Sequence, residues 1–287
     1  MLFRSAAPGI SIFHTIDWAR SIAEHYRHIQ PYGILIERDG RVLGGAATAL
    51  ISSPFFGKRL VSFPYAGFCD PLETEPGVIP ELLRQMLRLA AELRASQTLF
   101  KCRRPLSSTS EVRLREKARF KHHFIDLRPG KERVWEACSR TAVRREVKRA
   151  EKGGVILRAG NPADQPDLLS TFYSLFFMAR RRLCLPVMPA ALFETFGKVF
   201  KERCWVATAF VGDAPVSGAI GFLHGKDFYL EFAGDSPAGR ETGANQLTYW
   251  RAIEKALELG CDSFSFGRTS LEDEGLIRYK RHWGTIE

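Results

Sequence analysis

The sequence lacks the features of a membrane-spanning, disulfide-rich or zinc-binding protein. Its six cysteines are far apart and contain no C-x-x-C pair, which argues against a disulfide framework and a structural zinc module. No apolar run approaches the roughly 18–20 residues that span a bilayer, and the start of the chain has no secretory signal pattern. The seven histidines show no metal-ligand spacing, so we expect no bound metal. These absences predict reduced cysteines in a cytoplasmic protein.

Positive charge is abundant and unevenly distributed. The 287-residue chain has a formal net charge of +10. Residues 128–158 contain ten Lys and Arg against four Asp and Glu, whereas residues 159–287 contain 14 against 16. A dense basic segment favours an anionic partner such as RNA, a nucleotide-bearing cofactor or a membrane surface. The simpler interpretation is a solvated helix face.

Two stretches of the chain repeat one order of expected elements. With 45% hydrophobic and 26% charged residues, the chain is globular, and its length suggests two domains. The repeated order is strand, turn, strand, strand, helix, strand, at 33–52, 59–67, 79–96 and 98–103, and again at 204–225, 227–234, 245–260 and 262–268. The second copy follows at nearly constant spacing, which indicates a duplicated domain.

A basic helical segment separates the two copies. Residues 132–154 predict one amphipathic helix or two short ones, ending at Gly153-Gly154. Its basic side chains recur at positions that share one helical face: Arg144, Arg145, Lys148 and Arg149. Like charges so placed repel each other, which favours a polyanion bound nearby.

The repeated order resembles the GNAT acyltransferase fold. In that family an Arg/Gln-x-x-Gly-x-Gly/Ala loop leads into a helix, whose N-terminal amides and dipole face a pyrophosphate. Arg240 and Gly243 match this pattern and Ala244 follows, but Asn245 stands where a small residue is expected. The first copy has the acidic run 73–75 at the same place, so we expect no phosphate site there.

The whole chain resembles the FemAB/FemX family, nonribosomal peptidyltransferases that add amino acids to peptidoglycan precursors. The likeness is carried by residues 53–72, 143–155, 180–194 and 245–268, and by YKRHWG at 279–284. It is nearer to the branch associated with exopolysaccharide loci. The chain departs from the pattern by stopping three residues after the last of these runs, where the family continues into a further strand. That departure leaves the completeness of the second sheet open.

The resemblance implies a mixed α/β fold of two tandem GNAT-like domains, each a mixed sheet flanked by helices. We expect an N-terminal domain at 1–127, the basic helical segment at 128–158 and a catalytic domain at 159–287. The implied function is an N-acyltransferase acting on an amine of a cell-envelope or exopolysaccharide precursor. The donor is acyl-CoA or aminoacyl-tRNA, with acyl-CoA favoured. The alternative is a non-catalytic double-GNAT scaffold that binds RNA or an anionic membrane through the basic helix.

The acceptor implied by the family is a small-molecule or lipid-linked saccharide. Peripheral contact with the inner face of the membrane and binding of tRNA both remain open as partner interactions. The oligomeric state is not predicted.

Three residues are candidates for the acyl-transfer chemistry. Glu231 lies in an alternating apolar strand, where burial would raise its pKa and suit a general base; the alternative is a solvent-facing or arginine-paired glutamate. Tyr229 shares its face and could orient the substrate or act as the acid, or simply pack in the core. Lys280 resembles the lysine of the family's Phe-Lys motif at the acyl-transfer site. Trp283 beside it could form the wall of a substrate pocket.

Arginines supply the remaining candidate substrate contacts. Arg268 follows the last strand of the second copy, and α/β folds place ligands beside strand ends; the alternative is an ion pair with the acidic run 272–274. Arg180, Arg181 and Arg182 are consecutive, so a helix spreads them by about 100° each. We expect one or two of them, Arg180 and Arg181, to bind substrate phosphates.

Overall fold

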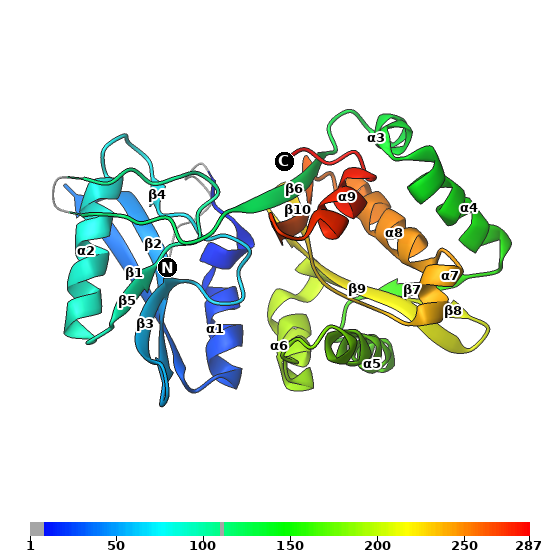
Figure 1. Cartoon of the computed structure of the whole chain (residues 1–287), viewed down its shortest axis with the longest axis horizontal. Coiled ribbons are helices and arrows are strands. Elements are labelled where there is room, and N and C mark those ends of the chain that lie inside the picture. The colour runs from blue at the N-terminus through cyan, green and yellow to red at the C-terminus, as the bar shows by residue number, and fades with distance from the viewer. Residues whose placement is uncertain (1–8, 110–111) are drawn as a thin grey trace. The chain divides into compact units, whose positions relative to one another are not determined.

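The structure is a computed structural model that describes residues 9–109 and 112–287. The first residues, where no secretory signal was found, lie partly outside the described part. The chain forms two compact units divided between Ala118 and Arg119 (Figure 1). The division falls before residue 127, the expected boundary, because residues 120–126 form a strand of the second sheet.

The first unit is a mixed sheet with helices. Its strands are β1 (Ile29–Arg38), β2 (Arg41–Ser53), β3 (Gly57–Ser62), β4 (Leu72–Glu73) and β5 (Gln97–Leu99). Its helices are η1 (Ile12–His14), α1 (Ile16–His25) and α2 (Ile79–Glu92). The sheet order is β1-β2-β3-β5, with β4 beside β2. The crossover helix α2 makes β3 and β5 parallel, and it buries Met86 and Ala90 against Ala46 and Leu60.

The second unit has a larger mixed sheet with the order β6-β11-β10-β9-β8-β7. Its strands are β6 (Phe120–Asp126), β7 (Ile156–Gly160), β8 (Cys204–Val211), β9 (Ala214–His224), β10 (Asp227–Asp235) and β11 (Ser263–Ser270). Its helices are α3 (Lys131–Ala137), η2 (Arg140–Arg144), α4 (Arg145–Lys152), α5 (Pro166–Arg182), α6 (Ala190–Phe200), η3 (Lys201–Arg203), α7 (Pro237–Glu241), α8 (Ala244–Glu258) and α9 (Glu274–Arg281). Only β10 and β11 are parallel neighbours among these described strands.

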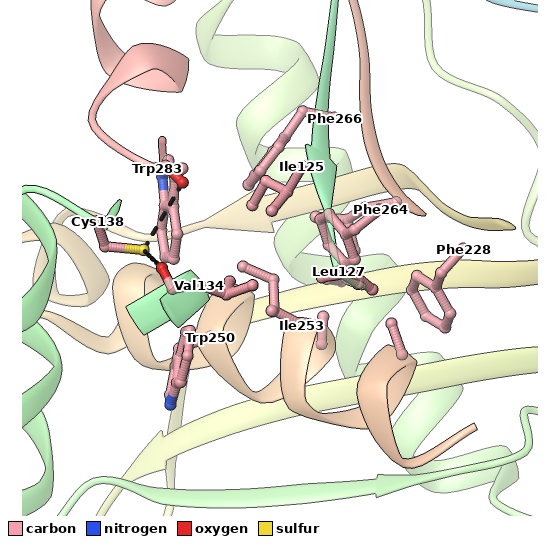
Figure 2. Packing of buried hydrophobic residues seen from close by; sticks show 14 of the residues in the cluster. Ile125, Leu127, Val134, Cys138, Phe228, Trp250, Ile253, Phe264, Phe266 and Trp283 are labelled. Carbon is pink, nitrogen blue, oxygen red and sulfur yellow. Dashed lines mark hydrogen bonds between the residues drawn. The ribbon is translucent and has the colours of Figure 1, made fainter. Parts of the chain in front are cut away.

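Two apolar layers cover the faces of this second sheet. On one face α8 buries Trp250 and Ile253 against Phe228 and Phe264 (Figure 2). On the other face α5 and α6 enclose Phe232 in a group of aromatic rings with centroids about 5–6 Å apart. Figure 1 shows α5 and α6 on the side of the sheet opposite to α8. The double burial fixes the register of the central strands.

The predicted duplication is confirmed in both units. Each contains three antiparallel strands, a crossover helix and a strand parallel to the third, as expected for tandem GNAT-like domains. The basic segment forms α3, the π-helix η2 and α4, and it ends at Gly153-Gly154 as expected. Val143, Val147 and Ala150 are buried in the core shared with α8, so this segment is part of the second unit. None of the described helices is long and apolar enough to cross a membrane.

Candidate active site

The central strands β10 and β11 separate after their first three residues. They pair in parallel only from Asp227–Tyr229 with Ser263–Ser265. Beyond this point the pairing of β10 with β9 shifts register between Leu230 and Phe232, and β11 shifts against β6 after Ser265. Such β-bulges re-aim side chains and end strand pairing. Beyond these three residues, neither strand therefore has a backbone partner in the other.

Glu231 is the extra residue at the β10 bulge. Leu230 packs on the α8 side of the sheet, whereas Phe232 packs among the aromatic rings of α5 and α6. The expectation that alternate residues from Phe228 to Phe232 share one face is therefore wrong, because the bulge inverts the alternation. Burial raises the pKa of Glu231 to about 7, although the charges of Lys280 and Arg268 lower it. The raised pKa agrees with the expectation that this carboxyl is desolvated.

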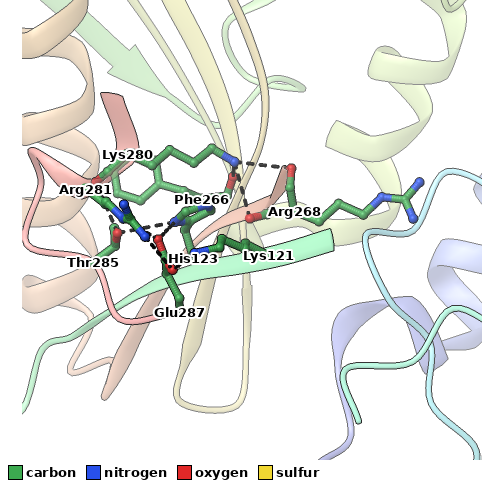
Figure 3. A network of polar contacts seen from close by, with 9 residues as sticks. Lys121, His123, Phe266, Arg268, Lys280, Arg281, Thr285 and Glu287 are labelled. Carbon is green, nitrogen blue, oxygen red and sulfur yellow. Dashed lines mark hydrogen bonds and ion pairs between the residues drawn. The ribbon is translucent and has the colours of Figure 1, made fainter. Parts of the chain in front are cut away.

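Lys280 of α9 is buried beside the β11 bulge and is only 6% exposed. Its Nζ donates to the carbonyl oxygens of Phe266, Gly267 and Arg268 at 2.7, 3.3 and 3.3 Å (Figure 3). Burial lowers the pKa of Lys280 to about 8, against the opposing effect of Glu231 and Asp273. The ammonium group thus holds the backbone where β11 leaves β10, and below about pH 8 it carries a positive charge that interacts with Glu231.

Arg268 completes this charged group. Its guanidinium carbon lies 4.3 Å from the ring centroid of Phe120, a cation–π contact that orients the side chain. Burial lowers the pKa of Arg268, whereas Glu231 raises it. The structure therefore brings together Glu231, Lys280 and Arg268, three of the predicted residues, through mutual electrostatic interaction.

Two predicted residues lie outside that group. The hydroxyl of Tyr229 donates to Asp227 Oδ2 at 3.3 Å, towards the start of β10. Trp283 is fully buried and packs against Phe266 with ring centroids 5.6 Å apart. The expectation that Trp283 forms the wall of a substrate pocket is therefore wrong, because its ring belongs to the core. The turn after α9 folds back towards the end of α3, where Cys138 Sγ donates to the Trp283 carbonyl (Figure 2).

The N-terminus of α8 lies after the carboxyl end of β10. Gly243 precedes it with φ of 77°, and a Cβ at this position would lie 2.4 Å from the carbonyl oxygen of Glu146. Only glycine combines that conformation with that approach. No side chain caps α8, and the first amides of a helix lack internal partners. Ala244 is fully buried at the first helical position. The expected loop over 240–245 is thus partly helical, since α7 precedes Gly243.

Asp235 organises the polar groups at the end of β10, a role that sequence reasoning missed. Its carboxylate pairs with Arg182 at 2.5 Å and with Arg240 Nε at 3.2 Å, and it accepts from Asn245 Nδ2 at 3.2 Å. The sequence feature that could have identified this role is a carboxylate at the end of a strand, beside the glycine-containing loop. The predicted cofactor residues Arg240 and Asn245 are therefore held next to each other, because both contact the carboxylate of Asp235.

The arginine triplet of α5 divides differently from the prediction. Arg182 reaches Asp235. Arg180 Nε instead donates to the Pro186 carbonyl at 3.0 Å, and Arg181 lies over the Phe177 ring at 5.9 Å. Of the three, Arg182 is therefore directed to the end of β10, although Arg180 and Arg181 were the predicted substrate contacts.

The basic face of η2 and α4 is partly neutralised within the chain. Arg145 and Arg149 both pair with Glu146, and Arg149 also donates to the Glu241 carbonyl at 2.6 Å. Arg144 is partly buried and Lys148 is exposed. Repulsion between these cations is therefore reduced in part within the chain, which weakens the argument for a polyanion.

The equivalent helix start in the first unit is occupied by its own carboxylate. Glu73 Oε2 accepts from the amides of Val78 and Ile79 at 3.0 and 3.1 Å. This capping agrees with the expectation of no phosphate site there. Across residues 9–109 and 112–287, no cluster of three or more His, Cys, Asp and Glu residues could hold a metal ion.

Similar proteins share this architecture. The fold is similar to that of FemX, with 14% identity, a TM-score of 0.66, and coverage of 98% of this chain and 90% of that one. A tandem GNAT protein from the clavulanic acid biosynthesis pathway has 12% identity, a TM-score of 0.56, and coverage of 98% and 86%. The C-terminal domain of a putative lysylphosphatidylglycerol synthetase from Agrobacterium fabrum has 14% identity, a TM-score of 0.53, and coverage of 88% and 75%. At these identities the likeness is one of fold.

Comparison of the sequence with models of protein families identifies the family of this chain. No curated protein matches the chain in sequence. A family described as acetyltransferase (GNAT) domain matches residues 138–281, which include β10, the α8 N-terminus and Lys280. Because this match spans half of the chain and both units have the expected fold, the chain belongs to the GNAT acetyltransferase family and has the tandem architecture of FemX.

Proposed function

We propose that this acyltransferase moves an acyl or aminoacyl group from an activated carrier to an amine of a cell-envelope precursor, with Glu231 as the general base. The observation that carries the proposal is the position of Glu231, half-buried at the bulge where β10 leaves β11, with its pKa raised to about 7 by desolvation. A carboxylate with a pKa near the operating pH is suited to remove a proton from an attacking amine.

The reaction needs no covalent enzyme intermediate. Glu231 takes a proton from the ammonium form of the acceptor, and the free amine attacks the acyl carbonyl. The tetrahedral intermediate collapses as its carbon–sulfur or carbon–oxygen bond to the carrier breaks, and the departing thiolate or alkoxide takes up the proton that the attacking nitrogen loses; Glu231 returns its own proton to solvent. Lys280 directs its Nζ to three carbonyl oxygens, so below about pH 8 it supplies a positive charge that is held in place. Together with Arg268 it favours the negative charge that develops on the acyl oxygen.

An acyl-CoA donor is the better supported carrier. The uncapped start of α8 after Gly243 offers amides and a helix dipole to a pyrophosphate. Arg182 and Arg240 are held beside it by Asp235. The cations at both places are paired with a carboxylate, those of α4 with Glu146 and those beside α8 with Asp235, so the uncapped start of α8 is the feature that favours acyl-CoA over tRNA.

The acceptor class rests on the similar proteins. The FemX-like architecture and the similarity to a putative lysylphosphatidylglycerol synthetase support a cell-envelope acceptor. Within that class, a small-molecule or lipid-linked saccharide with a free amine fits the proposed chemistry, and the exopolysaccharide branch of the resemblance favours an amino sugar.

The donor is tested by calorimetric titration with acetyl-CoA at moderate salt, followed by a screen of amino sugars as acceptors. We expect micromolar affinity, equivalent to about 8 kcal/mol. Gly243→Ala should weaken binding, whereas Gly77→Ala is a matched control, since Gly77 also has positive φ but no atom near its Cβ position. Absence of heat with acetyl-CoA and longer acyl-CoAs would exclude this donor. Aminoacyl-tRNA, with its steep salt dependence, would then be titrated instead.

A further inference from the structure

The turn between β2 and β3 exposes two adjacent phenylalanines. Phe55 and Phe56 are 90% and 75% exposed, and the next most exposed large apolar residue of the described chain, Leu183, is 59% exposed. Single exposed apolar side chains are ordinary. Two neighbouring ones at the tip of a hairpin form a contiguous apolar surface, which marks an interaction site.

The hairpin holds these two rings away from the rest of the sheet. β1 begins opposite Ile51 and β5 begins opposite Arg59, and the last backbone hydrogen bonds to the neighbouring segments are at Ser52 and Lys58, so residues 53–57 extend past both. The backbone amide of Phe56 donates to Ser53 Oγ at 3.2 Å, which orders the turn. One paired position, Ser53 with Gly57, extends the hairpin by about 3.4 Å past these contacts, and the turn with its two phenylalanine side chains lies beyond it. Amphipathic elements enter the boundary of a bilayer by about 5–10 Å.

Cations surround the base of this tip. Three segments meet there, since the Ser52 amide donates to the His28 carbonyl at 2.9 Å and Lys58 Nζ donates to the Leu93 carbonyl at 3.3 Å. Figure 1 shows the hairpin and the ends of α1 and α2 at the same end of this unit. Segments 24–30, 51–60 and 92–98 contain two acidic residues, Glu24 and Glu92. These segments contain four Lys and Arg: Arg27, Lys58, Arg59 and Arg94.

We propose that this hairpin tip binds an anionic lipid bilayer, with Phe55 and Phe56 inserted at the headgroup boundary and the surrounding cations on the lipid phosphates. A second copy of the chain is a poorer occupant. A symmetric contact places the same surface on both partners and would bring two sets of these cations together. An anionic membrane satisfies the apolar tip and the cations at once. The inference goes beyond the proposed acyl transfer, because it holds for any donor or acceptor.

The test is co-sedimentation of the full chain with vesicles of phosphatidylcholine containing about 30% phosphatidylglycerol, at low salt. Because membrane insertion would bury both Phe side chains in part, we expect Phe55→Ser/Phe56→Ser to lower the partition coefficient onto the vesicles by about 30-fold or more. Lys58→Gln and Arg94→Gln should each lower it about five-fold. The matched control is Ile156→Ser/Leu183→Ser, two apolar residues of 58% and 59% exposure in the other unit, which should bind as the parent does.

Three results would overturn the inference. One is that the parent chain fails to bind these vesicles. The second is that Phe55→Ser/Phe56→Ser binds them unchanged. The third is that the tip variant abolishes self-association in the ultracentrifuge while vesicle binding is absent, which would assign the surface to a second copy. The substituted side chains are exposed, so far-ultraviolet circular dichroism should confirm retained folding. Acetyl-CoA titration of the tip variant separates failure here from failure of the proposed function.

Discussion

Replacing Glu231 with glutamine should make the protein more stable at pH 8 and no more stable at pH 4. Burial raises the pKa of this carboxyl from 4.5 to about 7. Below pH 4.5 it is protonated in the folded and unfolded chains alike and costs nothing. Between pH 4.5 and 7 the unfolded chain releases the proton first, so stability falls as pH rises. Above pH 7 the whole cost of a buried charge is present.

The size of the effect follows from the pKa difference. At about 1.4 kcal/mol per pH unit, a rise from 4.5 to about 7 corresponds to about 3 kcal/mol. Glutamine keeps the shape and removes the charge. Lys280 then loses the attraction of a neighbouring carboxylate, which offsets part of the gain. We expect Glu231→Gln to raise the free energy of unfolding at pH 8 by about 1–3 kcal/mol, or Tm by roughly 2–12 °C.

The assay is thermal unfolding from pH 4 to 8 of the parent and two variants. Glu254→Gln is the matched control, because Glu254 is also largely buried. Burial raises the pKa of Glu254, but hydrogen bonds from Lys131 and Arg251 outweigh this and the pKa lies below its usual value. Glu254→Gln should therefore destabilise the protein at pH 8, the opposite sign. Equal shifts for both variants, or a loss of stability in Glu231→Gln at pH 8, would refute the burial argument.

Activity should respond in the opposite direction from stability. If Glu231 is the base and the charge of Lys280 is required, kcat/KM rises with pH through about 7 and falls above about 8, the pKa values of these two groups. Glu231→Gln should lower kcat by about 10²–10⁴-fold and remove this rise. A rate profile that keeps its rise near pH 7 in the variant would show that another group accepts the proton.

Three further changes probe the groups around the site. Gly243→Ala forces a Cβ to 2.4 Å from the Glu146 carbonyl oxygen, so denaturant unfolding should show a loss of about 2 kcal/mol or more; unchanged stability would mean that α4 and α8 are not packed as described. Lys280→Met leaves the carbonyls of 266–268 without their donor, so it should cost about 2–4 kcal/mol and abolish turnover; a fully active variant would contradict a role for the charge. Glu73→Gln in the first unit weakens the cap of α2 and should cost about 0.5–2 kcal/mol by the same assay, without altering acetyl-CoA binding.

Much of the fold could be predicted from local patterns. Alternation in the strands, helical periodicity and the turn residues predicted the repeated order, and the two copies confirmed each other. The same reasoning identified Glu231 from its apolar surroundings, since burial of a strand carboxylate depends mainly on its neighbours. The domain boundary was misplaced because β6 joins the second sheet through pairing with β11, a contact between residues more than 130 positions apart.

The sequence by itself determined the duplicated α/β order, the basic segment and the resemblance to GNAT acyltransferases. Only the tertiary structure decided which charged groups meet. The bulges in β10 and β11 are shifts in strand register that a two-residue periodicity in the sequence does not reveal. They place Glu231, Lys280 and Arg268 together. Long-range contacts also assigned Arg182, rather than its two neighbours, to Asp235. The physical reason is the same in each case: local sequence sets the direction of a side chain within its element, whereas packing sets what that side chain faces.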